Sequence, residues 1–115
     1  MHEVSLIQAL FDAADRAIEP HPSAAVRVLK VRVGELAGVQ GELLRTAFEL
    51  CRIERGYGDA ELVLVDEGAR WRCRDCGTEL PADAVRRCAL CGGEGRLSAG
   101  GELVLDRVEL DVVEE

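Results

Sequence analysis

Two pairs of cysteines constrain the fold of this chain more than any other feature. Cys73 and Cys76 form one Cys-x-x-Cys pair, Cys88 and Cys91 form a second, and eleven residues separate the pairs. Each pair places two thiols on one tight turn, and two such turns supply the four soft ligands of a tetrahedral Zn²⁺. Because a shell of four thiolates leaves no open coordination position, we predict a structural zinc site. A rubredoxin-like iron site uses the same ligands, and the spacing alone does not separate the two metals.

The segment around these cysteines has little else to hold it together. Residues 70–100 are rich in arginine and glycine and poor in large apolar side chains. Metal binding would therefore supply much of the folding free energy of this segment, on the order of 10 kcal/mol for such sites. Six arginines against four acidic residues leave it a formal charge of +2, which a Zn²⁺ with four thiolates would cancel.

Charge and hydropathy exclude several classes of partner. The formal net charge is −8, whereas nucleic-acid-binding proteins need a basic surface to displace counterions. No apolar run approaches the roughly 20 residues that span a bilayer, and the N-terminus lacks the basic region of a signal peptide. We therefore expect no nucleic acid and no membrane among the partners. Five cysteines without a signal peptide indicate a cytoplasmic protein, because paired thiols in a reducing compartment bind metal rather than form disulfides.

Apolar residues recur at helical or strand spacing along the rest of the chain. We predict helices over residues 3–19 and 41–54, and strands over residues 25–33, 61–66 and 103–113. Pro20 and Pro22 end the first helix. His21 between them is interpreted as a loop residue, and Cys51, on the apolar face of the second helix, as a buried small hydrophobic residue.

This order of elements predicts an α+β protein. A three-stranded sheet with two helices forms one domain from residues 1–69 and 101–115. A zinc-ribbon-like domain of residues 70–100 is inserted before the last strand, and residues 98–101 are predicted to be the linker that returns to the sheet.

The N-terminus offers a second set of metal ligands. The α-amine of Met1, the backbone nitrogens of His2 and Glu3, and the His2 imidazole lie within one short peptide. Such nitrogens can form the planar four-nitrogen set that Ni²⁺ and Cu²⁺ prefer. Structural explanations are also available, because a terminal histidine is commonly solvated and a glutamate in the first turn complements the helix dipole.

Four segments in combination resemble one protein family. The chain opens Met-His-Glu-x-Ser-Leu, continues with Val-Arg-Val-Gly-Glu-Leu at residues 31–36, contains the two cysteine pairs, and ends with Gly-Glu-Leu…Val-Glu-Leu at residues 101–110. Each segment is weak evidence alone, but together they resemble the HypA/HybF family of hydrogenase nickel-insertion accessory proteins over essentially the full length. That family has a nickel-binding α/β domain with a zinc domain inserted before its last strand.

The resemblance implies a function and its site residues. It implies that Cys73, Cys76, Cys88 and Cys91 bind structural zinc. It implies that His2, with the Met1 amine and the backbone of His2 and Glu3, binds Ni²⁺ as transferable cargo. A nickel metallochaperone of this kind is not an enzyme. Its expected partners are the GTPase HypB and the [NiFe]-hydrogenase large-subunit precursor, with urease accessory proteins as further partners in some members.

Two other functions fit the cysteines without the N-terminus. A zinc-ribbon interaction or regulatory module predicts one tightly bound zinc and no second metal. A rubredoxin-like electron carrier predicts a coloured iron protein with a reversible redox couple. Elemental analysis followed by Ni²⁺ titration of the untagged chain separates these functions from a nickel metallochaperone.

Overall fold

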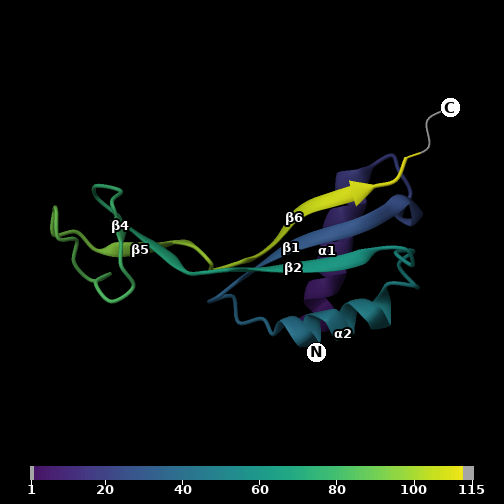
Figure 1. Cartoon of the computed structure of the whole chain (residues 1–115), viewed down its shortest axis with the longest axis horizontal. Helices are drawn as coiled ribbons and strands as arrows, with labels where there is room; N and C mark the ends of the chain where they lie inside the picture. Colours follow the sequence, from purple (N-terminus) through teal and green to yellow (C-terminus); the bar gives the residue numbers. More distant parts are fainter. Residues whose placement is uncertain (1, 113–115) are drawn as a thin grey trace.

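The computed structural model describes residues 2–112, which form two three-stranded sheets at opposite ends of an elongated molecule of 58 × 35 × 17 Å (Figure 1). The elements in chain order are α1 (His2–Ile18), η1 (Ser23–Ala25), β1 (Val26–Gly34), α2 (Gly41–Cys51), β2 (Glu61–Glu67), β3 (Arg70–Cys73), β4 (Glu79–Leu80), β5 (Gly95–Ala99) and β6 (Leu103–Leu110). The predicted α+β class and the sheet with two helices are confirmed.

The sheet with the longer strands, which we call the larger sheet, has the order β2-β1-β6. Its central strand is β1. β1 pairs with β2 in parallel and with β6 antiparallel. Alternate residues of β1 explain why one face is covered, because Leu29, Val31 and Val33 are buried in a core shared with both helices. Lys30 and Arg32 point to the opposite face.

Charged residues on that opposite face form ion pairs across all three strands. Arg32 of β1 lies 2.8 Å from Glu67 of β2 and 3.0 Å from Asp106 of β6, and Lys30 lies 3.8 Å from Asp106. Opposite charges on neighbouring strands stabilise the pairing modestly. Because apolar and charged residues alternate along β1, the helices cover the apolar face and the ion pairs occupy the other.

The two helices are joined by a cluster around the turn after α2. Phe11 of α1 stacks on Tyr57 with a centroid distance of 4.7 Å and on Phe48 of α2 at 5.7 Å. The Tyr57 hydroxyl donates a hydrogen bond to Asp15 of α1, and burial together with this bond raises the pKa of Tyr57. Arg55 pairs with Asp15 at 3.0 Å. The turn thus clamps α1 through both aromatic and charged contacts.

Removing the Tyr57 hydroxyl tests this clamp. We expect Tyr57→Phe to lower the free energy of unfolding by about 1–2 kcal/mol, because the bond that is lost has a charged acceptor. Urea unfolding followed by circular dichroism measures it. In an Asp15→Asn background the same change should cost less, and equal costs in both backgrounds would show that the hydroxyl and the carboxylate are not coupled.

The second sheet has the order β4-β3-β5 and extends directly from the first. Only Gly68 and Ala69 separate β2 from β3, and residues 100–102 connect β5 to β6. Ser98 and Ala99, predicted to be linker residues, belong to β5, because they continue its pairing with β3. No alternating pattern of apolar residues predicts these short strands.

Close contacts between glycines hold this connection. A Cβ atom on Gly34 would lie 2.5 Å from the carbonyl carbon of Gly100, and Gly100 has a φ of +83°. The backbone N–H of Ala69 donates to the Glu35 carboxylate at 2.9 Å, and that of Gly100 donates to the Glu67 carboxylate at 3.3 Å. Side chains at either glycine would push the two strands apart.

Other differences from the predicted elements are small. α2 ends at Cys51 rather than at residue 54, and the following residues form the turn that carries Arg55 and Tyr57. Cys51 is only partly buried, because it lies beside the core rather than within it. In the part of the chain that the structure describes, no helix is long and apolar enough to cross a membrane.

Candidate metal sites

Two turns of the same construction place the four cysteines. In the first, the N–H of Gly77 donates to the carbonyl of Cys73 at 3.1 Å, and the N–H of Cys73 donates to Thr78 at 2.8 Å. In the second, the N–H of Gly92 donates to Cys88 at 2.8 Å, and the N–H of Cys88 donates to Gly93 at 2.7 Å. Gly77 and Gly92 have φ angles of +76° and +79°, a conformation that favours glycine after each cysteine pair.

The turns bring all four cysteine sulfurs together, each within 4.8 Å of the others. The Sγ atoms of Cys73 and Cys91 lie 3.3 Å apart, and those of Cys76 and Cys88 lie 3.7 Å apart. A tetrahedral shell with Zn–S bonds of about 2.3 Å requires sulfurs roughly 3.8 Å apart. The four thiols therefore fit a structural zinc ion, with Cys73 and Cys88 on the buried side and Cys76 and Cys91 on the exposed side.

The electrostatics of the cluster favour a bound cation. Hydrogen bonds with Thr78 lower the pKa of Cys76 to about 6, and a backbone hydrogen bond at Cys76 lowers the pKa of Cys73. A backbone hydrogen bond at Gly93 also lowers the pKa of Cys91, but the neighbouring Cys73 and Cys76 outweigh it and raise this pKa to about 12. Four thiolates cannot share this space without a positive charge between them, and a divalent metal supplies that charge.

Little apolar packing surrounds the cluster. Leu80 is the only other buried residue in its small core, and Trp71 and Val85 pack against it partly buried. Gly93 is also close to the sulfurs, because a Cβ atom there would lie 2.9 Å from the Sγ of Cys73. The packing agrees with a fold element that depends on its metal.

Two of the three residues predicted to form the nickel site, His2 and Glu3, lie at the start of α1 in the other part of the molecule. Met1 lies outside the described residues. His2 is the first residue of α1 and is exposed, whereas the Glu3 side chain is buried at 9% exposure. Figure 1 marks the N-terminus on the helical side of the larger sheet and shows the cysteine segment at the far end of the long axis.

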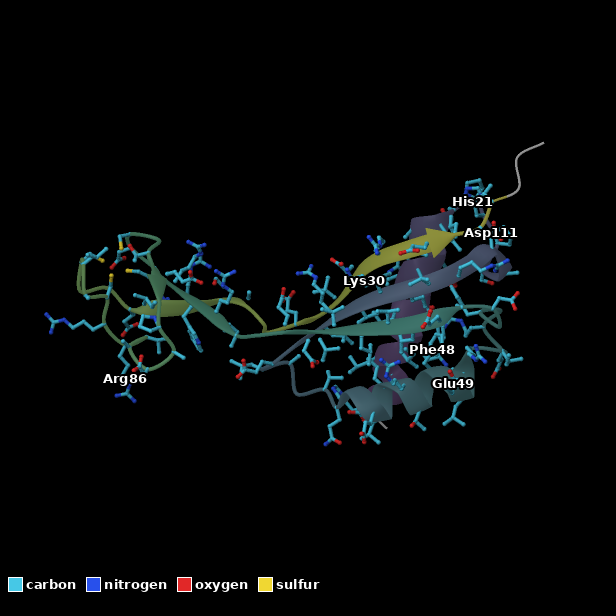
Figure 2. The ribbon with its side chains drawn as sticks, in the orientation of Figure 1. His21, Lys30, Phe48, Glu49, Arg86 and Asp111 are labelled. Carbon is cyan, nitrogen blue, oxygen red and sulfur yellow. The ribbon has the colours of Figure 1, made fainter. Side chains whose placement is uncertain are left out.

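No further cluster of metal-ligating side chains occurs within residues 2–112. His21 lies near Asp111 at the end of the larger sheet remote from the cysteines (Figure 2). Cys51 is a free thiol on α2. Neither residue joins the four-cysteine site. His21 lies outside the helices and strands, as predicted, whereas Cys51, predicted to be buried, is only partly buried.

The fold and this centre define a class of protein: a small α+β metal-binding protein with a four-cysteine module before its last strand. The family model described as "Hydrogenase/urease nickel incorporation, metallochaperone, hypA" matches residues 1–110. The chain belongs to this family of hydrogenase maturation factors.

Individual proteins agree with the family model. The "Hydrogenase maturation factor HypA" of Synechococcus elongatus is 35% identical over 111 residues, which cover 96% of this chain and 99% of that protein. The protein of the same name from Wolinella succinogenes is 29% identical over 118 residues and covers 100% and 99%.

Two solved structures share the fold. The solution structure of the Ni metallochaperone HypA from Helicobacter pylori has a TM-score of 0.65 at 27% identity and covers 93% of this chain and 92% of that one. A second solution structure, of a protein named HypA, has a TM-score of 0.77 at 26% identity and covers 96% of both chains. The fold expected from the resemblance is confirmed.

Proposed function

We propose that this chain binds Ni²⁺ at its N-terminus and delivers it for the maturation of a [NiFe]-hydrogenase, without catalysing a reaction itself. The observation that carries the proposal is the separation of two unlike ligand sets within one member of a nickel-incorporation family. The closed thiolate cluster suits a metal that stays, and the exposed histidine at the start of α1 suits one that leaves.

Zinc is the metal that we assign to Cys73, Cys76, Cys88 and Cys91. When bound, zinc neutralises the thiolates and stabilises the fold of the module, which we delimit as residues 70–100. The remaining residues, 1–69 and 101–115, form the domain that we propose to bind nickel.

Nickel would be held by the Met1 amine, the backbone nitrogens of His2 and Glu3, and the His2 imidazole. The first backbone N–H groups of an α-helix have no partner within the helix. His2 and Glu3 begin α1, so their amide nitrogens can bind a metal without breaking a helical hydrogen bond. Glu3 is buried, whereas His2 is exposed and its imidazole is accessible to a metal.

The expected partners follow from this role. We propose that the chain works with the GTPase HypB and passes nickel to the precursor of the hydrogenase large subunit, and that urease accessory proteins are further partners. By the order of divalent affinities the same nitrogens bind Cu²⁺ more tightly. Selectivity for nickel must therefore come from metal supply and from docking of the partner.

A transfer experiment tests the proposal. The untagged, zinc-loaded chain is charged with one equivalent of Ni²⁺ and mixed with HypB and the hydrogenase precursor, and metal content is measured after separation. Nickel should move to the precursor while zinc stays on the chain. A chain that holds one zinc and takes up no nickel would instead support the zinc-ribbon interaction module, and a coloured iron protein would support the electron carrier.

A further inference from the structure

An apolar stripe on the outer side of α2 lies outside both hydrophobic cores of residues 2–112. Leu43, Leu50 and Ile53 are exposed at 40%, 71% and 69%, although their spacing places them along one side of the helix and its C-terminal turn. The core-facing side of α2 is a different one and carries the fully or nearly fully buried Leu44 and Phe48. We call Leu43, Leu50 and Ile53 the α2 stripe. Single exposed apolar residues are common, but a contiguous row marks an interaction site.

Acidic side chains border the α2 stripe. Glu42 and Glu54 are exposed and form no ion pair among the described residues. Glu49 is not part of this border, because it lines a pocket with Ala60 and Leu62 on the β2 side of the helix.

The basic residues of α2 are directed elsewhere. Arg45 donates to the carbonyl of Leu62 on β2 at 3.0 Å. Arg52 donates to the carbonyl of Ala60 at 3.3 Å and pairs with Glu49 at 3.1 Å. Both guanidinium groups are thus committed to the β2 side of the helix, and the α2 stripe has an acidic border.

We propose that the α2 stripe is a docking site for an amphipathic helix of a partner protein. Basic residues border the apolar face of that helix. Leu43 and Leu50 are two helical turns apart and Ile53 is one turn further, which is the spacing that a second helix packs against. Lysine or arginine beside the apolar residues of that helix complements Glu42 and Glu54.

A second copy of this chain is a poorer occupant. Two-fold pairing through α2 would bring the same glutamates to both sides of the contact, and like charges across an interface repel. The location adds a reason for a different partner, because α2 packs against α1, the helix that begins at His2. A helix bound here would bring its protein near the start of α1, and this reason rests on the proposed nickel function. The docking site itself does not depend on nickel.

Synthetic peptides test the proposal without any metal cargo. One fluorescein-labelled peptide of about 18 residues, five helical turns, carries leucines at heptad spacing with lysines beside them, and its twin carries glutamates in place of the lysines. Binding to the zinc-loaded, nickel-free chain is followed by fluorescence anisotropy at low and high salt. We expect the lysine peptide to bind at least about tenfold more tightly than its twin, with a preference that falls as salt rises.

Matched variants locate the contact. Leu50→Glu should weaken binding of the lysine peptide by about tenfold or more, and Leu90→Glu, at a leucine that is 77% exposed on the cysteine module, should change it less than about twofold. Glu42→Lys should weaken the lysine peptide and strengthen its glutamate twin. Circular dichroism confirms that each variant is folded.

Three results would overturn the proposal. One is equal affinity for the two peptides or binding to neither. Another is an unchanged affinity in Leu50→Glu. The third is a dimer in light scattering that Leu50→Glu dissociates, because a second copy would then occupy the stripe. None of these results bears on nickel binding at His2, so failure here and failure of the nickel function are separable.

Discussion

His2→Ala is expected to abolish binding of Ni²⁺ while the chain keeps one equivalent of zinc. The imidazole supplies one of four nitrogens in the proposed planar set, and three remaining nitrogens cannot complete it. His2 is exposed and packs against nothing in the core, so its loss should leave the fold intact. We expect nickel affinity to fall by more than about 100-fold, because loss of an outer-shell partner alone costs about 10–100-fold and His2 is a proposed ligand. Isothermal calorimetry measures the nickel affinity, and elemental analysis measures the zinc.

Two further variants separate the imidazole from the terminus. One added residue before Met1 moves the α-amine out of the set, so it should have as large an effect as His2→Ala. His21→Ala removes the other histidine of the chain from a distant loop and should leave nickel binding unchanged. Unchanged nickel affinity in both His2→Ala and the extended chain would exclude an N-terminal site. Binding should also weaken on acidification, because protons compete with the metal for each nitrogen.

Cys73→Ser is expected to release zinc and unfold the cysteine module while the larger sheet and its helices remain. Cys73 is buried at 1% exposure at the end of β3, and the small core around it has few apolar contacts to replace the metal. The loss should approach the full metal contribution, on the order of 10 kcal/mol for the module. Trp71, the one tryptophan of the chain, lies on β3 in this module. Its fluorescence therefore reports the module, and far-ultraviolet circular dichroism reports the helices.

Cys51→Ser is the matched control, because it removes the one cysteine that lies far from the cluster in the larger domain. It should retain zinc and the Trp71 fluorescence of the parent protein. A Cys73→Ser chain that still holds one equivalent of zinc with native fluorescence would show that the four thiols are not the zinc shell.

Sequence patterns predicted the larger sheet and its two helices well because each of these elements buries one side. Ile7, Phe11 and Ala14 repeat at helical spacing, and Leu29 and Val31 alternate with charged residues, so period and burial agree. The cysteine module lacks such periodicity. β4 has two residues and β3 has four, and their pairing follows from the two thiolate turns rather than from an apolar face.

The candidate sites also differed in how far the sequence predicted them. The spacing of the cysteines predicted which four side chains would meet, since the turn chemistry is local. The α2 stripe was not predicted, because Leu43 and Leu50 widen the apolar pattern of α2 and look in sequence like part of its core face. Only the packing of Leu44 and Phe48 against the sheet shows that the stripe lies on another side.

The arrangement of strands also affects the order in which the chain can assemble. β6 is synthesised after the cysteine module, yet it pairs with the central strand β1. Closing a loop of residues 68–102 between β2 and β6 would cost about 3 kcal/mol of chain entropy. A zinc-bound module reduces that cost, because pairing of Arg70 with Ala99 already holds both ends of the loop together. Zinc captured by the nascent chain would therefore hasten completion of the larger sheet, and a cell short of zinc would accumulate chains whose last strand is late to dock.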